Sequence, residues 1–186
     1  MCKSTLKSDR KIELFQTGYY GLAFDFSVNP ESCENPDHFQ QFLLYNALSD
    51  MKTGMGVTYV MLESKGEGQN IIIGFVTLKS TSLVLRDEDH SLNGLPAVEI
   101  SELAVRDHYE QQGIGKALIG YALYVVSELR RRIGIQYMLV CSEPNAVGFY
   151  RKQHFIEART NYTVPHEIWN KSCVPMYMKL PEVDAP

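Results

Sequence analysis

Long apolar runs are missing from the 186-residue sequence. No segment approaches the roughly 18 to 20 apolar residues that an α-helix needs to cross a bilayer. The first ten residues are polar and lack the apolar block of a secretory signal. These absences favour a cytoplasmic protein without a membrane partner.

Cysteine is sparse and scattered. The 4 cysteines, Cys2, Cys33, Cys141 and Cys173, lie far apart and form no C-x-x-C pair. Such spacing is typical neither of a zinc site nor of a disulfide framework. The sequence therefore predicts reduced thiols and no bound metal.

Neither sign of charge dominates, since 18 Lys and Arg stand against 22 Asp and Glu, for a net charge of −4. Nucleic-acid affinity depends mainly on neutralising phosphates, so this balance argues against a nucleic-acid-binding protein. The composition, with 45% hydrophobic and 22% charged residues, is ordinary for a globular chain. The length fits a single domain over residues 1–186, with residues 1–9 expected to be flexible.

Hydrophobic periodicity predicts the order of the elements. Strands are expected at 11–15, 57–62, 71–79, 97–105, 136–141, from 155 onward and at 174–180. Helices are expected at 37–51, where Asp37 could cap, at 118–133, and just after Pro144. Residues 17–35 and 86–96 are expected to be loops. This order predicts one α+β domain with a mixed sheet.

The most informative stretch is residues 99–119, where a strand, a short loop, Gly113-x-Gly115 and a helix start follow one another. Glycines let backbone N–H groups converge, and the first N–H groups of a helix lack internal partners, so this arrangement suits a phosphate or pyrophosphate. A tight strand-to-helix turn without a ligand is the alternative. Because Leu118 replaces a third glycine and Ala117 follows Lys116, the common NAD and ATP fingerprints are absent.

Two motifs in the second half resemble those of the GNAT superfamily of acyl-CoA-dependent N-acetyltransferases. Residues 98–105 and 111–118 are similar to its motif A, Arg/Gln-x-x-Gly-x-Gly/Ala, and residues 146–155 are similar to its motif B. If Gly113 and Gly115 are the glycines of motif A, Glu110 stands at the usual Arg/Gln position, whereas a shifted register, Gln112-x-x-Gly115-x-Ala117, satisfies the pattern. His154 stands at a usual glycine of motif B. The resemblance implies a three-layer fold in which helices flank a mixed, mostly antiparallel sheet.

The resemblance also implies acetyl-CoA as cosubstrate, with no metal. The backbone of Leu103, Ala104 and Val105 would pair with the pantetheine arm of the cosubstrate. The pyrophosphate would be wrapped by Gln111, Gln112, Gly113, Ile114, Gly115 and Lys116. The reaction would be direct attack of a neutral amine on the thioester, through a tetrahedral oxyanion.

That chemistry needs a base for the amine proton and a donor for the leaving thiolate. Tyr150 matches the motif B tyrosine that commonly serves as the donor. Glu99 matches the glutamate base of the histone-acetylating branch. Glu102 is the alternative base, and Glu143 is a third candidate. In a regular strand, residues 99 and 102 would face opposite sides, so one of them alone could point into a given cleft.

The sequence leaves three functions open. The first is an N-acetyltransferase for a primary amine of a small molecule, an amino acid or a protein, acting as a possible homodimer. The second is a toxin that acetylates the amino group of aminoacyl-tRNA and pairs with an antitoxin, because residues 39–60, 73–78 and 176–180 resemble that branch of the family. The third is a catalytically degenerate sensor of coenzyme A, suggested by Glu110 and His154.

Overall fold

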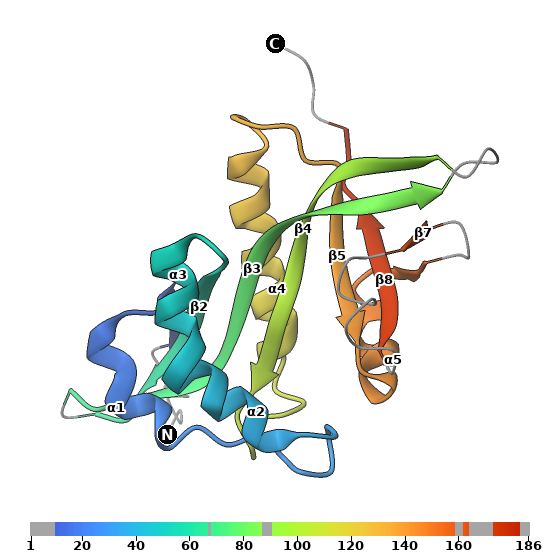
Figure 1. Ribbon diagram of the computed structural model, residues 1–186. Helices are drawn as coiled ribbons and strands as arrows, with labels where there is room; N and C mark the ends of the chain where they lie inside the picture. The colour runs from blue at the N-terminus through green and yellow to red at the C-terminus, as the bar shows by residue number, and fades with distance from the viewer. Residues whose placement is uncertain (1–9, 67, 87–90, 159–161, 164–172, 183–186) are drawn as a thin grey trace, which may run out of the picture.

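The computed structural model describes residues 10–66, 68–86, 91–158, 162–163 and 173–182 (Figure 1). Residues 1–9, for which the sequence predicts flexibility, lie outside the described residues. In the described part of the chain, no helix is long and apolar enough to span a membrane.

A single mixed sheet runs through the molecule. Its strands are β1 Arg10–Leu14, β2 Val57–Ser64, β3 Asn70–Arg86, β4 Leu92–Val105, β5 Tyr137–Ser142, β6 Ile156–Glu157, β7 Tyr162–Thr163 and β8 Val174–Lys179. The order is β1-β2-β3-β4-β5-β8-β6, with β7 paired to β3. The β4–β5 pair is parallel and the other pairs are antiparallel. The predicted α+β fold with a mixed, mostly antiparallel sheet is confirmed.

Helices cover both faces of this sheet. The front layer in Figure 1 contains η1 Thr17–Tyr19, α1 Tyr20–Ala23, α2 Pro36–Gln41, the π-helical η2 Phe42–Asn46 and α3 Ala47–Thr53. The long helix α4 Ile114–Leu129 lies behind the sheet. The short η3 Pro144–Ala146 and α5 Val147–Arg151 follow β5. The predicted three layers are therefore present.

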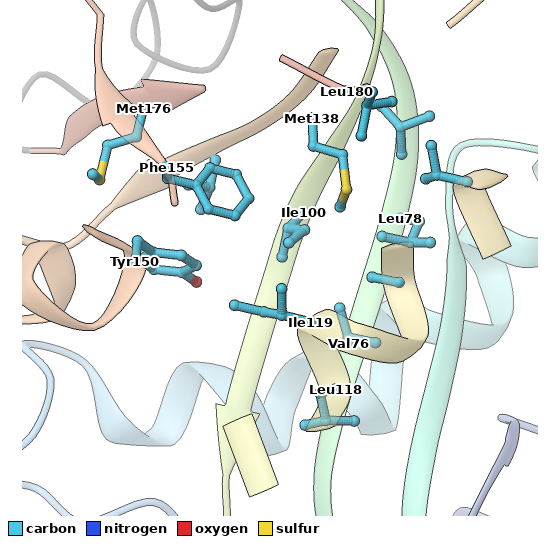
Figure 2. Close-up of a cluster of buried hydrophobic side chains, with 14 of the residues drawn as sticks. Val76, Leu78, Ile100, Leu118, Ile119, Met138, Tyr150, Phe155, Met176 and Leu180 are labelled. Carbon is cyan, nitrogen blue, oxygen red and sulfur yellow. The ribbon is translucent and has the colours of Figure 1, made fainter. Parts of the chain in front are cut away.

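Each face of the sheet buries its own apolar core. Behind it, side chains of the sheet pack against Leu118, Ile119 and Ala122 of α4 and against Tyr150 and Phe155 (Figure 2). In front, Phe75 is fully buried, with ring centroids 5.4 Å from Phe26 and 5.9 Å from Phe42. Losing one such phenylalanine typically costs about 3–5 kcal/mol of stability, so these contacts hold η2 and the segment between α1 and α2 over β3.

The first predicted helix exists, but its start and middle differ from expectation. It begins at Pro36, with Asn35 at the N-cap, and no side chain caps it. Asp37 lies inside the first turn, so the expected cap at Asp37 is wrong. Its middle is π-helical, and it ends at Thr53, where Gly54 has φ +76°. Glycine adopts this left-handed conformation at little cost, which explains the stop.

Other element boundaries also differ from the prediction. The expected loop at 86–96 is mostly strand, because β3 runs to Arg86 and β4 starts at Leu92. The expected loop at 17–35 contains η1 and α1. Helix α4 ends at Leu129 rather than near Ile133, whose side chain is 58% exposed. The apolar spacing continued past the end of the helix, and spacing alone does not mark where a helix stops.

Candidate functional site

The strands β4 and β5 pair over part of their length and then separate. The parallel register runs from Ala97 with Tyr137 to Ile100 with Val140, yet β4 continues to Val105. Beyond Ile100 the other edge of β4 is still paired with β3. Among the described strands, none pairs with the β5-facing edge of β4 over residues 101–105, so backbone groups there are open. Figure 1 shows the two strands diverging toward the bottom of the view.

A cavity of about 430 Å³ opens where these strands diverge. It is lined by Val28, Ser32, Cys33, Glu34, Asn35, His38, Phe39, Ile100, Ser101, Glu102, Leu103, Ala104, Val105, Glu110, Val140, Cys141, Ser142, Glu143, Ala146 and Tyr150. We call this cavity the acidic cleft. Tyr150, Glu102 and the strand residues 103–105, which the sequence singled out, all line it, whereas Glu99 does not.

A β-bulge at Ser101 decides where the two glutamates of β4 point. Ile100 pairs with Leu78 and Glu102 with Thr77, so Ser101 has no partner on β3. Pairing partners share a face of the sheet. Glu99 is opposite Lys79, which contacts Asp50 of α3, and Glu102 contacts His38 of α2. Both glutamates thus face the front layer, and the predicted opposite orientation is wrong because the strand is not regular.

Within this face, Glu102 reaches the acidic cleft and Glu99 does not. Glu99 is buried, 7% exposed, and it lies beside Leu139 of β5 where β4 and β5 are still paired. The side chain of Glu102 accepts a hydrogen bond from Nε2 of His38, at 3.1 Å from its Oε2. This bond raises the pKa of His38 above its ordinary value. The base role predicted for Glu99 stays a prediction, and the geometry favours Glu102.

Tyr150 projects from α5 into the same space. Its ring packs against Phe149 and Phe155, with centroids 5.1 and 5.6 Å away, and the residue is 6% exposed. Figure 2 shows its hydroxyl oxygen turned toward β4. Burial, and then the carboxylates of Glu102 and Glu143, raise the pKa of the Tyr150 phenol. The phenol therefore keeps its proton at neutral pH.

The turn from β4 to α4 is held by hydrogen bonds to other parts of the chain. The backbone N–H groups of Arg106 and Asp107 donate to Ile73 O and Ser27 O, at 3.0 and 2.8 Å. Positive φ angles occur at His108, Gln111 and Gly113, at 64°, 60° and 80°. The first bond of α4 runs from Ala117 N–H to Gly113 O. The N–H groups of residues 114–116 consequently have no partner within the helix.

The two glycines of this turn have different roles. Gly113 is the N-cap of α4 and needs its left-handed φ, while a Cβ there would meet nothing within 4 Å. Gly115 has no positive φ, but a Cβ there would lie 3.0 Å from Cζ of Phe149. Gly113 thus shapes the turn, and Gly115 lets α4 approach α5 closely.

A buried carboxylate anchors the turn to the neighbouring strand. Oε2 of Glu63 accepts hydrogen bonds from Tyr109 Oη at 2.7 Å and Lys65 Nζ at 2.5 Å, and its Oε1 accepts one from Arg10 Nε at 2.9 Å. Arg10 also donates to Oε1 of Gln112, at 3.0 Å. Although burial raises the pKa of Glu63, these bonds lower it to about 2. Glu63 therefore stays ionised and fixes the position of the turn. No motif in the sequence indicated it.

Glu110, which replaces the arginine or glutamine of the motif, also lines the acidic cleft. Its Oε1 is buried, and no donor within hydrogen-bonding distance is found among the described residues. Buried carboxylate oxygens normally accept hydrogen bonds. Glu110 is thus an acceptor that a ligand with amide N–H groups could satisfy.

Three cysteines gather near the cleft, contrary to the prediction of reduced and separate thiols. Cys141 and Cys173 form a disulfide, with Cα atoms 5.4 Å apart. Pro175 is the register partner of Cys141, so the antiparallel pairing of β5 with β8 places Cys173 within reach. The free Cys33 lines the cleft with Cys141. Spacing along the chain could not reveal a pair made by strand pairing. No cluster suited to a metal ion occurs in the described ranges.

The site also contains residues that the sequence left unmarked. His38, Cys33 and Glu34 reach the cleft from α2 and the segment before it. No motif marks this segment, and only the packing of α2 on the sheet brings it to β4. Cleft residues of β4, such as Glu102 and Val105, come instead from the stretch that resembles motif A.

Comparison with known proteins supports this description. The acetyltransferase (GNAT) family model matches residues 19–155. A search of curated proteins found no match.

Solved structures with a similar fold include toxins. A tyrosine-to-phenylalanine mutant of the AtaT toxin superposes with a TM-score of 0.73 at 17% identity, over 92% of this chain and 89% of that one. A similar mutant of KacT gives 0.71 at 16% identity, over 91% and 94%. AtaT complexed with acetyl-methionyl-tRNAfMet gives 0.67 at 21% identity, over 84% and 94%. At these identities the likeness concerns the fold.

Proposed function

This chain belongs to the acetyltransferase (GNAT) family and is an acyltransferase, and on that premise we propose that it moves the acetyl group of acetyl-CoA to a primary amine bound in the acidic cleft. GNAT enzymes use acetyl-CoA. The observation that carries the proposal is that Tyr150, Glu102 and the unpaired edge of β4 all line one cavity.

Three features of the chain fit acetyl-CoA. The N–H groups of residues 114–116, at the positive end of α4, suit the diphosphate. The unpaired edge of β4 over residues 101–105 can pair with the two amides of the pantetheine arm, as an added strand would. Oε1 of Glu110 is a buried acceptor without a partner among the described residues, and a pantetheine N–H can satisfy it.

The proposed reaction assigns its proton transfers to two side chains. Glu102 removes a proton from the acceptor ammonium, and the neutral nitrogen attacks the thioester carbon. The oxyanion that forms is stabilised by backbone N–H groups at the β4 edge. When the carbon–sulfur bond breaks, Tyr150 donates its proton to the leaving thiolate, and the resulting phenolate takes the second proton from the attacking nitrogen, which thereby becomes an amide. Glu102 releases the first proton to solvent. The products are the N-acetylated amine and coenzyme A.

The test is the release of coenzyme A thiol from acetyl-CoA across a panel of primary amines. We expect amine-dependent release by the native protein. We expect Tyr150→Phe to lower kcat by about 100-fold, because the thiolate loses its proton donor, while KM for acetyl-CoA stays within about twofold. Binding of acetyl-CoA without release for any amine would support a coenzyme A sensor instead. A native kcat in Tyr150→Phe would remove Tyr150 from the mechanism.

A second candidate acceptor is aminoacyl-tRNA, with an antitoxin as partner protein. The similarity in fold to AtaT and KacT, and the structure of AtaT with acetyl-methionyl-tRNAfMet, favour it. The net charge of −4 opposes it, since tRNA binding requires phosphate neutralisation. Acetylation of aminoacyl-tRNA would fall steeply as salt rises, whereas a small-amine reaction would be much less sensitive. For either acceptor, we also propose that the enzyme is cytoplasmic and forms a homodimer.

A further inference from the structure

Acidic side chains from three parts of the chain line the acidic cleft around Glu102, where the acceptor amine would react. Glu34 reaches it from the segment before α2, Glu102 from β4, and Glu143 from the residue after β5. Among the described residues that line the cleft there is no lysine or arginine. The only basic lining residue, His38, is already paired with Glu102. The wall of the cleft therefore has an excess of negative charge.

These carboxylates are close enough to act on one another. Burial raises the pKa of Glu143. The backbone of Glu34 and the charge of His38 lower this pKa in part, and the charges of the Glu34 and Glu102 carboxylates raise it. Burial raises the pKa of Tyr150, and the charges of Glu102 and Glu143 raise it further. Carboxylates held together in this way repel one another unless a cation lies between them.

The hydroxyl of Tyr150 gives an independent indication that a ligand binds here. The residue is 6% exposed and lines the cavity, and none of the described residues makes a hydrogen bond to its hydroxyl. Figure 2 shows this oxygen turned toward β4. A hydroxyl that opens from apolar surroundings into a cavity can exchange a hydrogen bond with a polar ligand bound there.

The reaction constrains the charge of this ligand. An amine must lose its proton before it attacks the thioester, so the reacting nitrogen is neutral at that moment. It then no longer balances the carboxylates around it. A second positive charge on the same acceptor would remain and would balance Glu34 and Glu143 throughout the reaction.

We propose that the acceptor is a small aliphatic amine with a second cationic group, a diamine or polyamine, whose second ammonium lies between Glu34 and Glu143 while the reacting amine lies at Glu102 and Tyr150. This inference rests on the proposed acetyl transfer and specifies its substrate class. A free small molecule fits because the carboxylates line a cavity of about 430 Å³ that must also admit the thioester.

The test compares two amines that differ in the second group alone. The two amines are 1,4-diaminobutane, whose second terminal group is an ammonium, and 4-amino-1-butanol, whose second terminal group is a hydroxyl. We expect kcat/KM to be about tenfold or more higher for the diamine, because hydrogen bonds between charged groups are stronger than those of a neutral hydroxyl. Spermidine is expected to behave like the diamine.

A double variant tests whether Glu34 and Glu143 bind the second ammonium of the acceptor. When both Glu34→Gln and Glu143→Gln are made in one protein, the ratio of kcat/KM for the diamine to that for the amino alcohol should fall toward one. The matched control is Glu31→Gln, an exposed residue three positions before Glu34 that does not line the cleft, and it should keep the native ratio.

Each remaining outcome has a clear meaning. Equal kcat/KM for the two amines in the native protein would overturn the inference and leave the acetyltransferase intact. A lysine-rich peptide or an aminoacyl-tRNA that exceeds spermidine in kcat/KM would also overturn it. Absence of transfer to every amine would overturn the proposed function itself.

Discussion

Two hollows lie along β4, and they differ in chemistry. The acidic cleft is lined by β4 from Ile100 to Val105, where the strand has left β5. The second hollow, of about 270 Å³, lies at the other end of β4 and is lined there by Pro96, Ala97 and Val98. We call it the apolar hollow. Its one charged lining residue among those described, Lys79, is paired with Asp50 at 3.6 Å.

The pairing of the backbone, rather than the size of the hollow, distinguishes the acidic cleft from the apolar hollow. At the apolar hollow, Ala97 and Val98 are paired with β3 on one side and with β5 on the other. At the acidic cleft, the β5 side of β4 is open and a bulge at Ser101 turns Glu102 inward. Unpaired backbone groups and inward carboxylates are what a polar ligand requires.

Among the variants that alter binding of acetyl-CoA, the largest effect is expected at the turn that leads from the acidic cleft into α4. Gly113→Asp places a carboxylate where the diphosphate would bind, so we expect KM for acetyl-CoA to rise by about tenfold or more. Gly113→Asn is the matched control, because asparagine has the same shape and also tolerates a positive φ. Equal KM values in the two variants would show that charge at this turn does not matter.

A smaller effect is expected where Glu63 anchors the turn. Glu63→Gln should raise KM for acetyl-CoA by about three- to fivefold with kcat nearly unchanged, since the turn loses its ionic anchor. The exposed control Glu128→Gln should have the native KM. A fall in kcat without a change in KM would contradict a positioning role.

The same residue predicts a dependence of stability on pH. Hydrogen bonds from Lys65, Tyr109 and Arg10 lower the pKa of Glu63 to about 2 from its ordinary value of 4.5, although burial raises it. Its contribution to the free energy of unfolding is therefore present above pH 4.5 and lost as the pH falls toward 2. Denaturant unfolding of Glu63→Gln across that interval should show a weaker dependence on pH than the native protein.

The smallest effect is expected at the apolar hollow. Ile133 lines it and is 58% exposed. Ile133→Ser should leave both kcat and KM within about twofold of native values, because the hollow takes no part in acetyl transfer. A strong loss of kcat would mean that the two hollows are not independent.

The sequence predicted the site residues from the second half of the chain better than those from the first half. Residues 99–119 join a strand, a turn and a helix within one local stretch, so their arrangement follows from neighbouring residues. Tyr150 was found because it lies at a fixed place in a second motif. His38 and Glu63 meet the site through contacts at sequence separations of 64 and 46, which no local pattern records.

Irregular backbone explains the errors that remain. The bulge at Ser101 reversed the expected relation of Glu99 to Glu102, and one extra residue is invisible to a period-two pattern. The π-helical turn Phe42–Asn46 likewise keeps a helical pattern of apolar residues. The pairing of Cys141 with Cys173 follows from the register of β5 and β8 rather than from spacing.

The central claim is that coenzyme A binds along the open edge of β4 and over the start of α4. Amide hydrogen exchange with and without coenzyme A tests it residue by residue. If coenzyme A binds there, exchange should slow at the backbone N–H groups of residues 114–116 and at those N–H groups of residues 101–105 that lie on the open edge of β4. Unchanged exchange at both places, or slowing confined to the apolar hollow, would contradict it.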